Sequence, residues 1–266
     1  MPRKTAISAL FLDFDGTISP LGVSRPKAQV SSALADVLQK IAEVVPVAVI
    51  TTKDMRFIQE RVPFASAWAA IGGIEIKIGD RILGPTQEIS SPSSVEALLG
   101  RLEAKTRQID ESVCIERKTL SDGRVVAFCI DWRLTMDWEL VRRRLEPLLK
   151  SVEEDGFTVL TYPGRPYADV YQDGADKGKA LLTLRSELRI NEPIMYLGDS
   201  EPDNSAFDLA DISIGVLHSE TPPSLRCEFF IQFNHIETFF RDLWRNRLVF
   251  DPKSQWIVRN RPRETG

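Results

Sequence analysis

The sequence is poor in the residues that build disulfide scaffolds and histidine-based sites. Its 266 residues include three cysteines and two histidines. Cys114, Cys129 and Cys227 are odd in number and lack CxxC spacing, which favours a reduced cytosolic protein over a disulfide scaffold. His218 and His235 lack the spacing of metal ligands, so neither a structural zinc site nor a histidine-based triad is expected.

Long apolar runs and an excess of basic charge are also missing. No apolar run is long enough to span a bilayer. The formal net charge of −4 offers no basic surface for nucleic acid or an anionic membrane. Near the N-terminus a short apolar run ends at Asp13, so we expect a first strand there and not a signal peptide. These absences predict a cytoplasmic globular protein, with enough length for two domains.

The sequence does contain a regular alternation of apolar runs and amphipathic segments. Residues 7–12, 45–50 and 68–71 are short apolar runs typical of buried strands. Residues 27–44 and 54–62 carry apolar side chains at helical spacing. This β-α-β-α-β order predicts a parallel sheet with crossover helices.

The pattern changes after about residue 80, to helix, hairpin, helix, hairpin, and returns from about residue 175. We therefore expect an α/β fold with a Rossmann-like parallel-sheet core and an inserted, smaller α+β cap domain. The expected boundaries are 1–80 and 173–250 for the core, 81–172 for the cap and 251–266 for a polar tail. No GxGxxG follows the first strand, which argues against a nucleotide-binding oxidoreductase.

Residues with catalytic chemistry follow the predicted strands. Asp13 and Asp15 end the first strand in FLDFDGT, and Thr51 follows the second. Lys177 precedes a helix, and the segment GDSEPDN follows a later strand. Aspartate is disfavoured in strands, and a buried charge needs a partner. Because the carboxyl ends of parallel strands face one crevice, these residues are predicted to converge.

The residue types suit phosphoryl transfer. Asp13 offers a carboxylate nucleophile and Asp15 a general acid and base. Thr51 and Lys177 offer phosphate contacts. Magnesium prefers oxygen ligands and needs few of them from the protein. The predicted metal ligands are Asp13, Asp15, Asp199 and Asp203. Gly16 would let the backbone turn closely around the phosphate, and Thr52 competes with Thr51 as a phosphate contact.

In this order, DFDGT, a strand-end threonine, a lysine and GDSxxD resemble the motifs of the haloacid dehalogenase superfamily of phosphatases. The resemblance implies magnesium and an aspartyl-phosphate on Asp13. Residues 115–133 and the segment YPGRPYADVYQDGADKGKAL also resemble the cap of trehalose-6-phosphate phosphatases. That implies sugar binding by Glu116, Lys118 and Asp169, with Arg133 lining the cap.

The sugar stays open, because several positions depart from that family. The second motif is TTKD where that family has SGR, and Asp169 occupies the position of the usual cap glutamate. TTK and GDSxxDN also resemble mannosyl-3-phosphoglycerate and sucrose-phosphate phosphatases. The sequence therefore predicts a monomer that hydrolyses a small-molecule sugar phosphate, with trehalose 6-phosphate as the first choice. The alternative substrates are a mannosyl- or glucosyl-3-phosphoglycerate or a sucrose phosphate. The alternative to an enzyme is a non-hydrolysing sugar-phosphate sensor or a regulatory partner of a glycosyltransferase.

Overall fold

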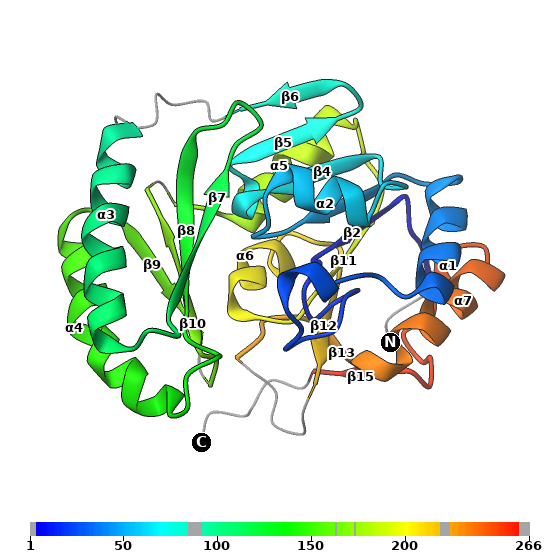
Figure 1. Cartoon of the computed structure of the whole chain (residues 1–266). Helices are drawn as coiled ribbons and strands as arrows, with labels where there is room; N and C mark the ends of the chain where they lie inside the picture. Colours follow the sequence, from blue (N-terminus) through cyan, green and yellow to red (C-terminus); the bar gives the residue numbers. More distant parts are fainter. Residues whose placement is uncertain (1–3, 85–91, 163, 173, 219–223, 261–266) are drawn as a thin grey trace, which may run out of the picture. The chain divides into compact units, whose positions relative to one another are not determined.

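The computed structural model describes residues 4–84, 92–162, 164–172, 174–218 and 224–260 (Figure 1). The chain divides into two compact units, one formed by Met1–Leu83 with Asp176–Gly266 and the other by Gly84–Ala175. The second unit is thus inserted within the sequence of the first.

The first unit is built on a nine-stranded sheet. Its six central strands are parallel, from β13 through β12, β11, β2 and β3 to β4. In spatial order the strands are β15 (Ile257–Arg259), β13 (Phe229–Gln232), β12 (Ile212–Leu217), β11 (Ile194–Gly198), β2 (Ala9–Leu12), β3 (Val47–Ile50), β4 (Ala67–Ala70), β5 (Glu75–Ile78) and β6 (Arg81–Leu83). The predicted α/β fold with a parallel-sheet core is confirmed.

Helices follow β2, β3 and β11 in the chain and form the crossovers to the next parallel strand. The α-helices of this unit are α1 (Ser32–Ala42), α2 (Met55–Arg61), α5 (Lys177–Glu187), α6 (Asn204–Phe207) and α7 (Ile236–Arg245). Short 3-10 turns are η1 (Arg25–Lys27), η2 (Ile71–Gly73), η3 (Glu201–Asp203) and η4 (Phe233–His235). A separate two-stranded ribbon pairs β1 (Thr5–Ala6) with β14 (Val249–Phe250).

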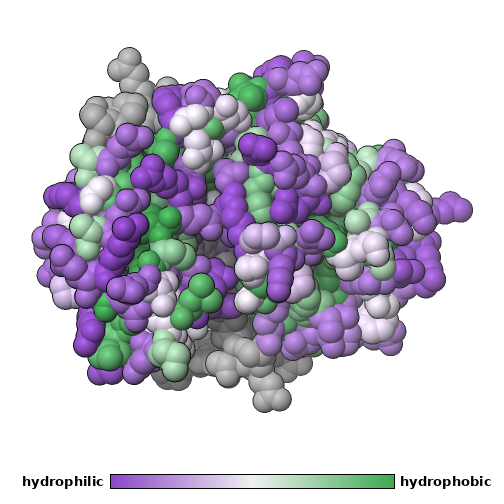
Figure 2. Space-filling model, viewed as in Figure 1, coloured by the Kyte–Doolittle hydropathy of each residue, from purple (hydrophilic) through white to green (hydrophobic). Residues whose placement is uncertain are grey.

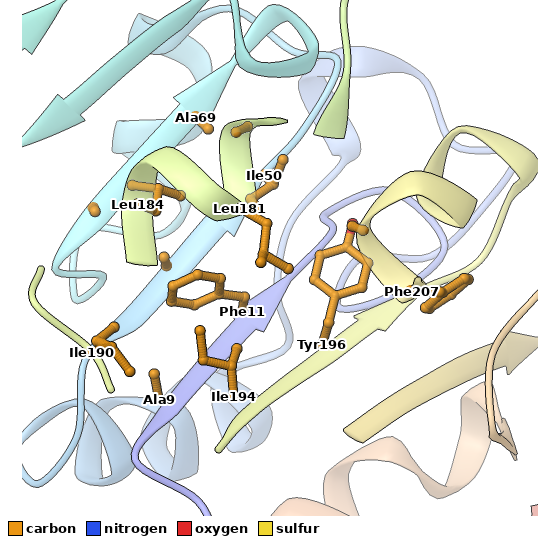
Figure 3. Close-up of a cluster of buried hydrophobic side chains, with 14 of the residues drawn as sticks. Ala9, Phe11, Ile50, Ala69, Leu181, Leu184, Ile190, Ile194, Tyr196 and Phe207 are labelled. Carbon is orange, nitrogen blue, oxygen red and sulfur yellow. The ribbon is translucent and has the colours of Figure 1, made fainter. Parts of the chain in front are cut away.

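Both faces of the central strands are buried, which is the rule for parallel sheets. Phe11 and Tyr196 are register partners on β2 and β11 and lie in one apolar cluster with Leu181 of α5 and Phe207 of α6 (Figure 3). Leu10 of β2 is also fully buried and points to the opposite face, because successive strand residues alternate. Burial of apolar surface, which contributes about 25 cal/mol per Å², is the main source of stability for the sheet.

Both edges of the sheet are antiparallel, and one of them includes residues that were expected outside the core. Strands β5 and β6 form an antiparallel hairpin at one edge, and β15 pairs antiparallel with β13 at the other. Residues 257–259 were expected in a polar tail. They form a strand because they can pair with the free edge of β13. Ile257 is buried there, while Val258 and Arg259 stay exposed, as an edge strand allows. Residues 261–266 of the expected tail lie outside the described residues.

The second unit is a four-stranded antiparallel sheet with two helices. Its strand order is β7-β8-β10-β9. Its elements are α3 (Pro92–Ile109), β7 (Cys114–Thr119), β8 (Val125–Asp131), α4 (Trp138–Glu154), β9 (Thr158–Thr161) and β10 (Tyr167–Tyr171). An apolar cluster joins Leu99 of α3 and Leu145 of α4 to Phe128 and Val170 of the sheet, so both helices cover one face.

Hydrophilic side chains predominate on the face of the molecule seen in Figure 2, with hydrophobic ones interspersed. None of the described helices combines the length and the apolar character that a membrane span requires.

Candidate active site

Three neighbouring strands end at the predicted site. Asp13 follows β2, Asp199 follows β11 and Thr51 follows β3. These strands are parallel neighbours, so their carboxyl ends lie at the same edge of the sheet. The backbone N–H of Asp13 donates to the carbonyl of Leu197 at 2.8 Å, which extends the pairing of β2 with β11 to the first catalytic candidate.

A buried group of carboxylates occupies this edge. Oxygen atoms of Asp13, Asp199 and Asp203 lie within 4.8 Å of one another, and the residues are 4%, 5% and 0% exposed. Lys177 Nζ lies 2.9 Å from Asp13 Oδ1 and 2.6 Å from Asp203 Oδ1. One ammonium does not balance three carboxylates, and carboxylate oxygens are the ligands that Mg²⁺ prefers. The donor set therefore fits a divalent cation.

Burial governs the protonation of the closest pair. Loss of water raises the pKa of Asp13 to about 7, with Lys177 opposing the shift and Asp203 adding to it. Burial alone would lower the pKa of Lys177, but the charges of Asp13 and Asp203 outweigh it and raise that pKa. Lys177 is thus held as an ammonium, and a bound cation would favour the ionised form of Asp13.

Asp203 is held by hydrogen bonds on both oxygens. Its Oδ1 accepts from Lys177 and from the Tyr196 hydroxyl at 2.5 Å. Its Oδ2 accepts from the backbone N–H groups of Asp199 and Ser200, both at 3.0 Å. Gly198 is required here, because a Cβ at that position would lie 2.3 Å from Asp203 Cγ. Asp203 therefore orients Asp199 and Lys177, which leaves Asp13 and Asp199 better placed to hold an ion.

The turn after Asp13 brings the backbone against this group. Gly16 has φ +74°, and its N–H donates to the Ser19 carbonyl at 2.8 Å. A Cβ on Gly16 would lie 2.2 Å from Asp199 Oδ2. The glycine predicted to approach the phosphate thus also makes room for the carboxylate of Asp199.

Asp15 is not one of these three carboxylates, although its charge adds to the raised pKa of Asp13. Its Oδ2 is 3.2 Å from the Nζ of Lys53, the third residue of the TTKD segment. Its predicted role as a metal ligand gains no support from the group of three carboxylates. Thr51 is fully buried, and its Oγ1 accepts from the Lys53 N–H at 3.3 Å, whereas Thr52 is half-buried.

Three residues at the site were missed from sequence. Tyr196 looked like an ordinary strand residue, because its hydroxyl partner Asp203 is reached only in the fold. Lys53 was visible as a departure from SGR but received no role. His218 belongs to none of the motifs, yet its Nε2 lies 2.6 Å from the Gly16 carbonyl oxygen, and its ring lies 4.8 Å from that of Phe233. Because a carbonyl only accepts, this contact requires a proton on Nε2.

Two of the predicted sugar-binding residues of the second unit, Lys118 and Asp169, form a buried network with Tyr162. Lys118 Nζ lies 2.6 Å from Asp169 Oδ1, and the Tyr162 hydroxyl donates to Asp169 Oδ2 at 2.7 Å. Glu116 stands in the same cross-strand row as Asp169, through Cys129. Lys118 and Asp169 are both 3% exposed, so they satisfy each other within the unit. Their contact with a sugar stays a prediction.

Arg133 lies two residues after the end of β8 and is exposed. Its Nε is 2.7 Å from Asp131 Oδ2, and its guanidinium lies 5.6 Å from the centre of the Tyr167 ring. The side chain is therefore oriented by two neighbours of its own sheet, and its predicted place in the cap lining stays a prediction.

Replacing Gly16 by alanine should displace Asp199 and weaken magnesium binding by about 10-fold or more, the scale on which disturbed support of metal ligands acts. Gly22 provides a matched control, since its φ is also +74° but a Cβ there would meet nothing within 4 Å. Isothermal titration with Mg²⁺ should show weak binding for Gly16→Ala and wild-type binding for Gly22→Ala. Equal losses in both variants would assign the effect to backbone strain and not to Asp199.

Comparison with known proteins identifies the family. A family model described as trehalose-phosphatase matches residues 11–213, more than half of the chain. An uncharacterized glycosyl hydrolase of Mycobacterium tuberculosis is 28% identical over 224 residues, covering 80% of this chain and 16% of that protein. Trehalose-phosphate phosphatase B of Arabidopsis thaliana is 26% identical over 259 residues, covering 90% of this chain and 67% of that protein.

A trehalose-phosphate phosphatase of Mycobacterium tuberculosis is 26% identical over 226 residues, covering 80% of this chain and 54% of that protein. The chain thus spans less than two thirds of the length of two of these three relatives.

Solved structures share the fold. The C-terminal domain of a C. albicans trehalose-6-phosphate phosphatase has a TM-score of 0.70 and 18% identity, covering 90% of this chain and 93% of that domain. A sugar phosphatase of the haloacid dehalogenase superfamily has a TM-score of 0.57 and 13% identity, covering 91% of this chain and 100% of the other. These likenesses show the fold, and the family match shows that the chain belongs to the trehalose-phosphatase family, as its resemblance to trehalose-6-phosphate phosphatases predicted.

Proposed function

We propose that this protein hydrolyses a sugar phosphate monoester with the help of magnesium. The observation that carries the proposal is the position of Asp13, a strand-end carboxylate 2.9 Å from the buried ammonium of Lys177 and grouped with Asp199 and Asp203. A nucleophile, a fixed cation and a set of metal ligands therefore meet at one edge of the sheet, which is the set of groups that phosphoryl transfer needs.

The chain's own residues supply two steps. In the first, an Asp13 oxygen bonds to phosphorus while the bond from phosphorus to the sugar oxygen breaks, and Asp15 gives that oxygen a proton. In the second, water attacks the phosphorus of the aspartyl-phosphate and Asp15 takes a proton from the water. The bond from phosphorus to the Asp13 oxygen breaks, its electron pair stays on that oxygen, and the Asp13 carboxylate and free phosphate result. Splitting one hydrolysis into two easier displacements is the general advantage of covalent catalysis.

The other residues bind and neutralise. Lys177 and Thr51 would contact oxygens of the phosphoryl group, and Gly16 lets the backbone approach it closely. Asp13 and Asp199 would hold magnesium, with Asp203 fixing the orientation of Asp199. When bound, the ion would supply positive charge against the phosphoryl oxygens.

Trehalose 6-phosphate is the proposed substrate. The family match and the two relatives named trehalose-phosphate phosphatases, each 26% identical, support this choice. The departures from the motifs of trehalose-6-phosphate phosphatases keep three alternatives: sucrose 6-phosphate, mannosyl-3-phosphoglycerate and glucosyl-3-phosphoglycerate.

The test is phosphate release from a panel of those four compounds, glucose 6-phosphate and p-nitrophenyl phosphate. We expect release to require Mg²⁺ and to stop when EDTA is added, with one sugar phosphate hydrolysed fastest. If folded, magnesium-loaded protein releases no phosphate from any of them, the phosphatase proposal fails. Calorimetric binding of a sugar phosphate without turnover would then favour the sensor alternative.

A further inference from the structure

The acid/base candidate Asp15 has a cationic neighbour to which no role has been given. Lys53 Nζ lies 3.2 Å from Asp15 Oδ2. The two side chains are partly buried, at 19% and 31% of their full exposure, so water screens this pair less than it screens a surface ion pair. The contact engages one carboxylate oxygen, and the group has a second oxygen for the proton that it transfers.

The position of Lys53 is fixed by its own surroundings. Its N–H donates to Thr51 Oγ1 at 3.3 Å, and its carbonyl accepts from the Ile71 N–H at 2.8 Å. Its ammonium lies 6.0 Å from the centre of the Phe57 ring, at the outer limit of a cation–π contact. The backbone on both sides of the lysine is therefore held to the sheet edge.

The same aromatic ring supports the turn that carries Asp15. Phe14 lies between Asp13 and Asp15 in sequence, and its ring packs edge-to-face with the ring of Phe57, with centroids 5.7 Å apart. Phe57 lies in the first turn of α2, where its N–H donates to the capping side chain of Asp54 at 2.9 Å. Lys53 and the catalytic turn thus share one rigid support.

We propose that Lys53 is a positioning residue for the proposed phosphatase reaction. It holds the carboxyl group of Asp15 where that group can protonate the leaving oxygen. As the bond between phosphorus and the leaving oxygen breaks, that oxygen takes the bond's electron pair and the proton of Asp15. Asp15 is then a carboxylate beside the Lys53 ammonium, in the form that accepts a proton from water in the second step. This inference rests on the proposed function.

The leaving group provides a sharp test. p-Nitrophenolate departs without a proton, whereas phenolate and alkoxide oxygens need one increasingly. We expect Lys53→Met to lower kcat/KM about 10-fold to 100-fold for phenyl phosphate and for the best sugar phosphate, within the range of general acid catalysis. For p-nitrophenyl phosphate the loss should stay below about 3-fold, because its leaving group needs no proton from Asp15. The second step, in which Asp15 takes a proton from water, does not enter kcat/KM, which reports only steps up to the first irreversible one. Aryl phosphates also remove sugar recognition from the comparison.

Three variants control the result. Lys53→Arg keeps a donor and should recover most of the lost rate with phenyl phosphate. Lys40→Met removes an exposed lysine of α1 and should match the wild type. In an Asp15→Asn background, adding Lys53→Met should cost less than about 2-fold, because a residue that acts through Asp15 has nothing left to position. Equal losses for both aryl phosphates, or additive losses with Asp15→Asn, would overturn the proposal.

A crystallographic comparison separates this inference from the proposed function. In Lys53→Met crystals we expect the Asp15 carboxylate to leave its wild-type position or to split between conformers, while Asp13 and Asp199 keep theirs. An unmoved Asp15 would refute the positioning role. If the wild type hydrolyses nothing, the phosphatase function fails on that result alone, and the crystals still decide whether Lys53 positions Asp15.

Discussion

Replacing Asp13 by asparagine is expected to lower kcat/KM for phosphate release by about 10⁴-fold or more, as removal of a catalytic nucleophile does. The amide cannot form the acyl-phosphate bond that the mechanism requires. The substitution keeps the shape of the side chain, and Lys177 keeps its 2.6 Å contact with Asp203, so the fold should survive. Magnesium-dependent release from the best substrate of the panel measures the loss.

The control for this variant is an aspartate outside the site. Asp36 is exposed on α1, so Asp36→Asn should keep wild-type activity. Thermal unfolding should show a similar Tm for the wild type and both variants. Residual activity above about 1% in a folded Asp13→Asn protein would mean that another group, or water directly, attacks phosphorus, since loss of the nucleophile should cost far more.

Replacing Lys177 by methionine is expected to destabilise the protein by about 3–5 kcal/mol, the cost of leaving buried charge without its partner. Lys177 is 3% exposed and is the ammonium between Asp13 and Asp203, which are 4% and 0% exposed. Without it, two buried carboxylates repel each other. Urea unfolding in EDTA measures the change in the free energy of unfolding.

The neighbouring lysine gives a matched control for that experiment. Lys179 lies two residues further along α5 and is exposed, so Lys179→Met should change the free energy of unfolding by less than about 0.5 kcal/mol. Mg²⁺ should restore part of the stability lost in Lys177→Met, because an ion that binds only the folded state stabilises it. A loss below about 1 kcal/mol in EDTA would show that the carboxylates are relieved by protonation, which removes the buried charge.

The core of the fold could be predicted because local patterns and the tertiary structure agree there. Residues 7–12 and 45–50 are apolar on both faces, as strands covered by helices must be. The edges could not be predicted in the same way. The β5–β6 hairpin and β15 are short and half-exposed, so their pairing depends on an adjacent strand edge more than on their own composition.

The candidate site divides along the same line. Asp13, Asp199 and Lys177 stand in segments whose order along the chain is distinctive, and the structure brings them together. The partner of Tyr196 is Asp203, which the turn after β11 brings to its hydroxyl, and the partner of Lys53 is Asp15, which is remote in sequence. Neither contact can be predicted from the sequence pattern. In the second unit, Lys118 on β7 pairs with Asp169 on β10, and these strands lie on either side of β8. The sequence predicts the strands but not their register, so it does not predict this pair.

The insertion of the second unit also sets an order for folding during synthesis. β2 pairs with β11, which lies about 180 residues later in the chain, and Gly84–Ala175 is made between them. The second unit consists of neighbouring hairpins and helices, whose short loops close with little loss of entropy. It can therefore fold while one edge of β2 still lacks its partner. The pairing that sets Asp199 beside Asp13 forms only once β11 has been made, so the candidate site is assembled after Gly84–Ala175 has been synthesised.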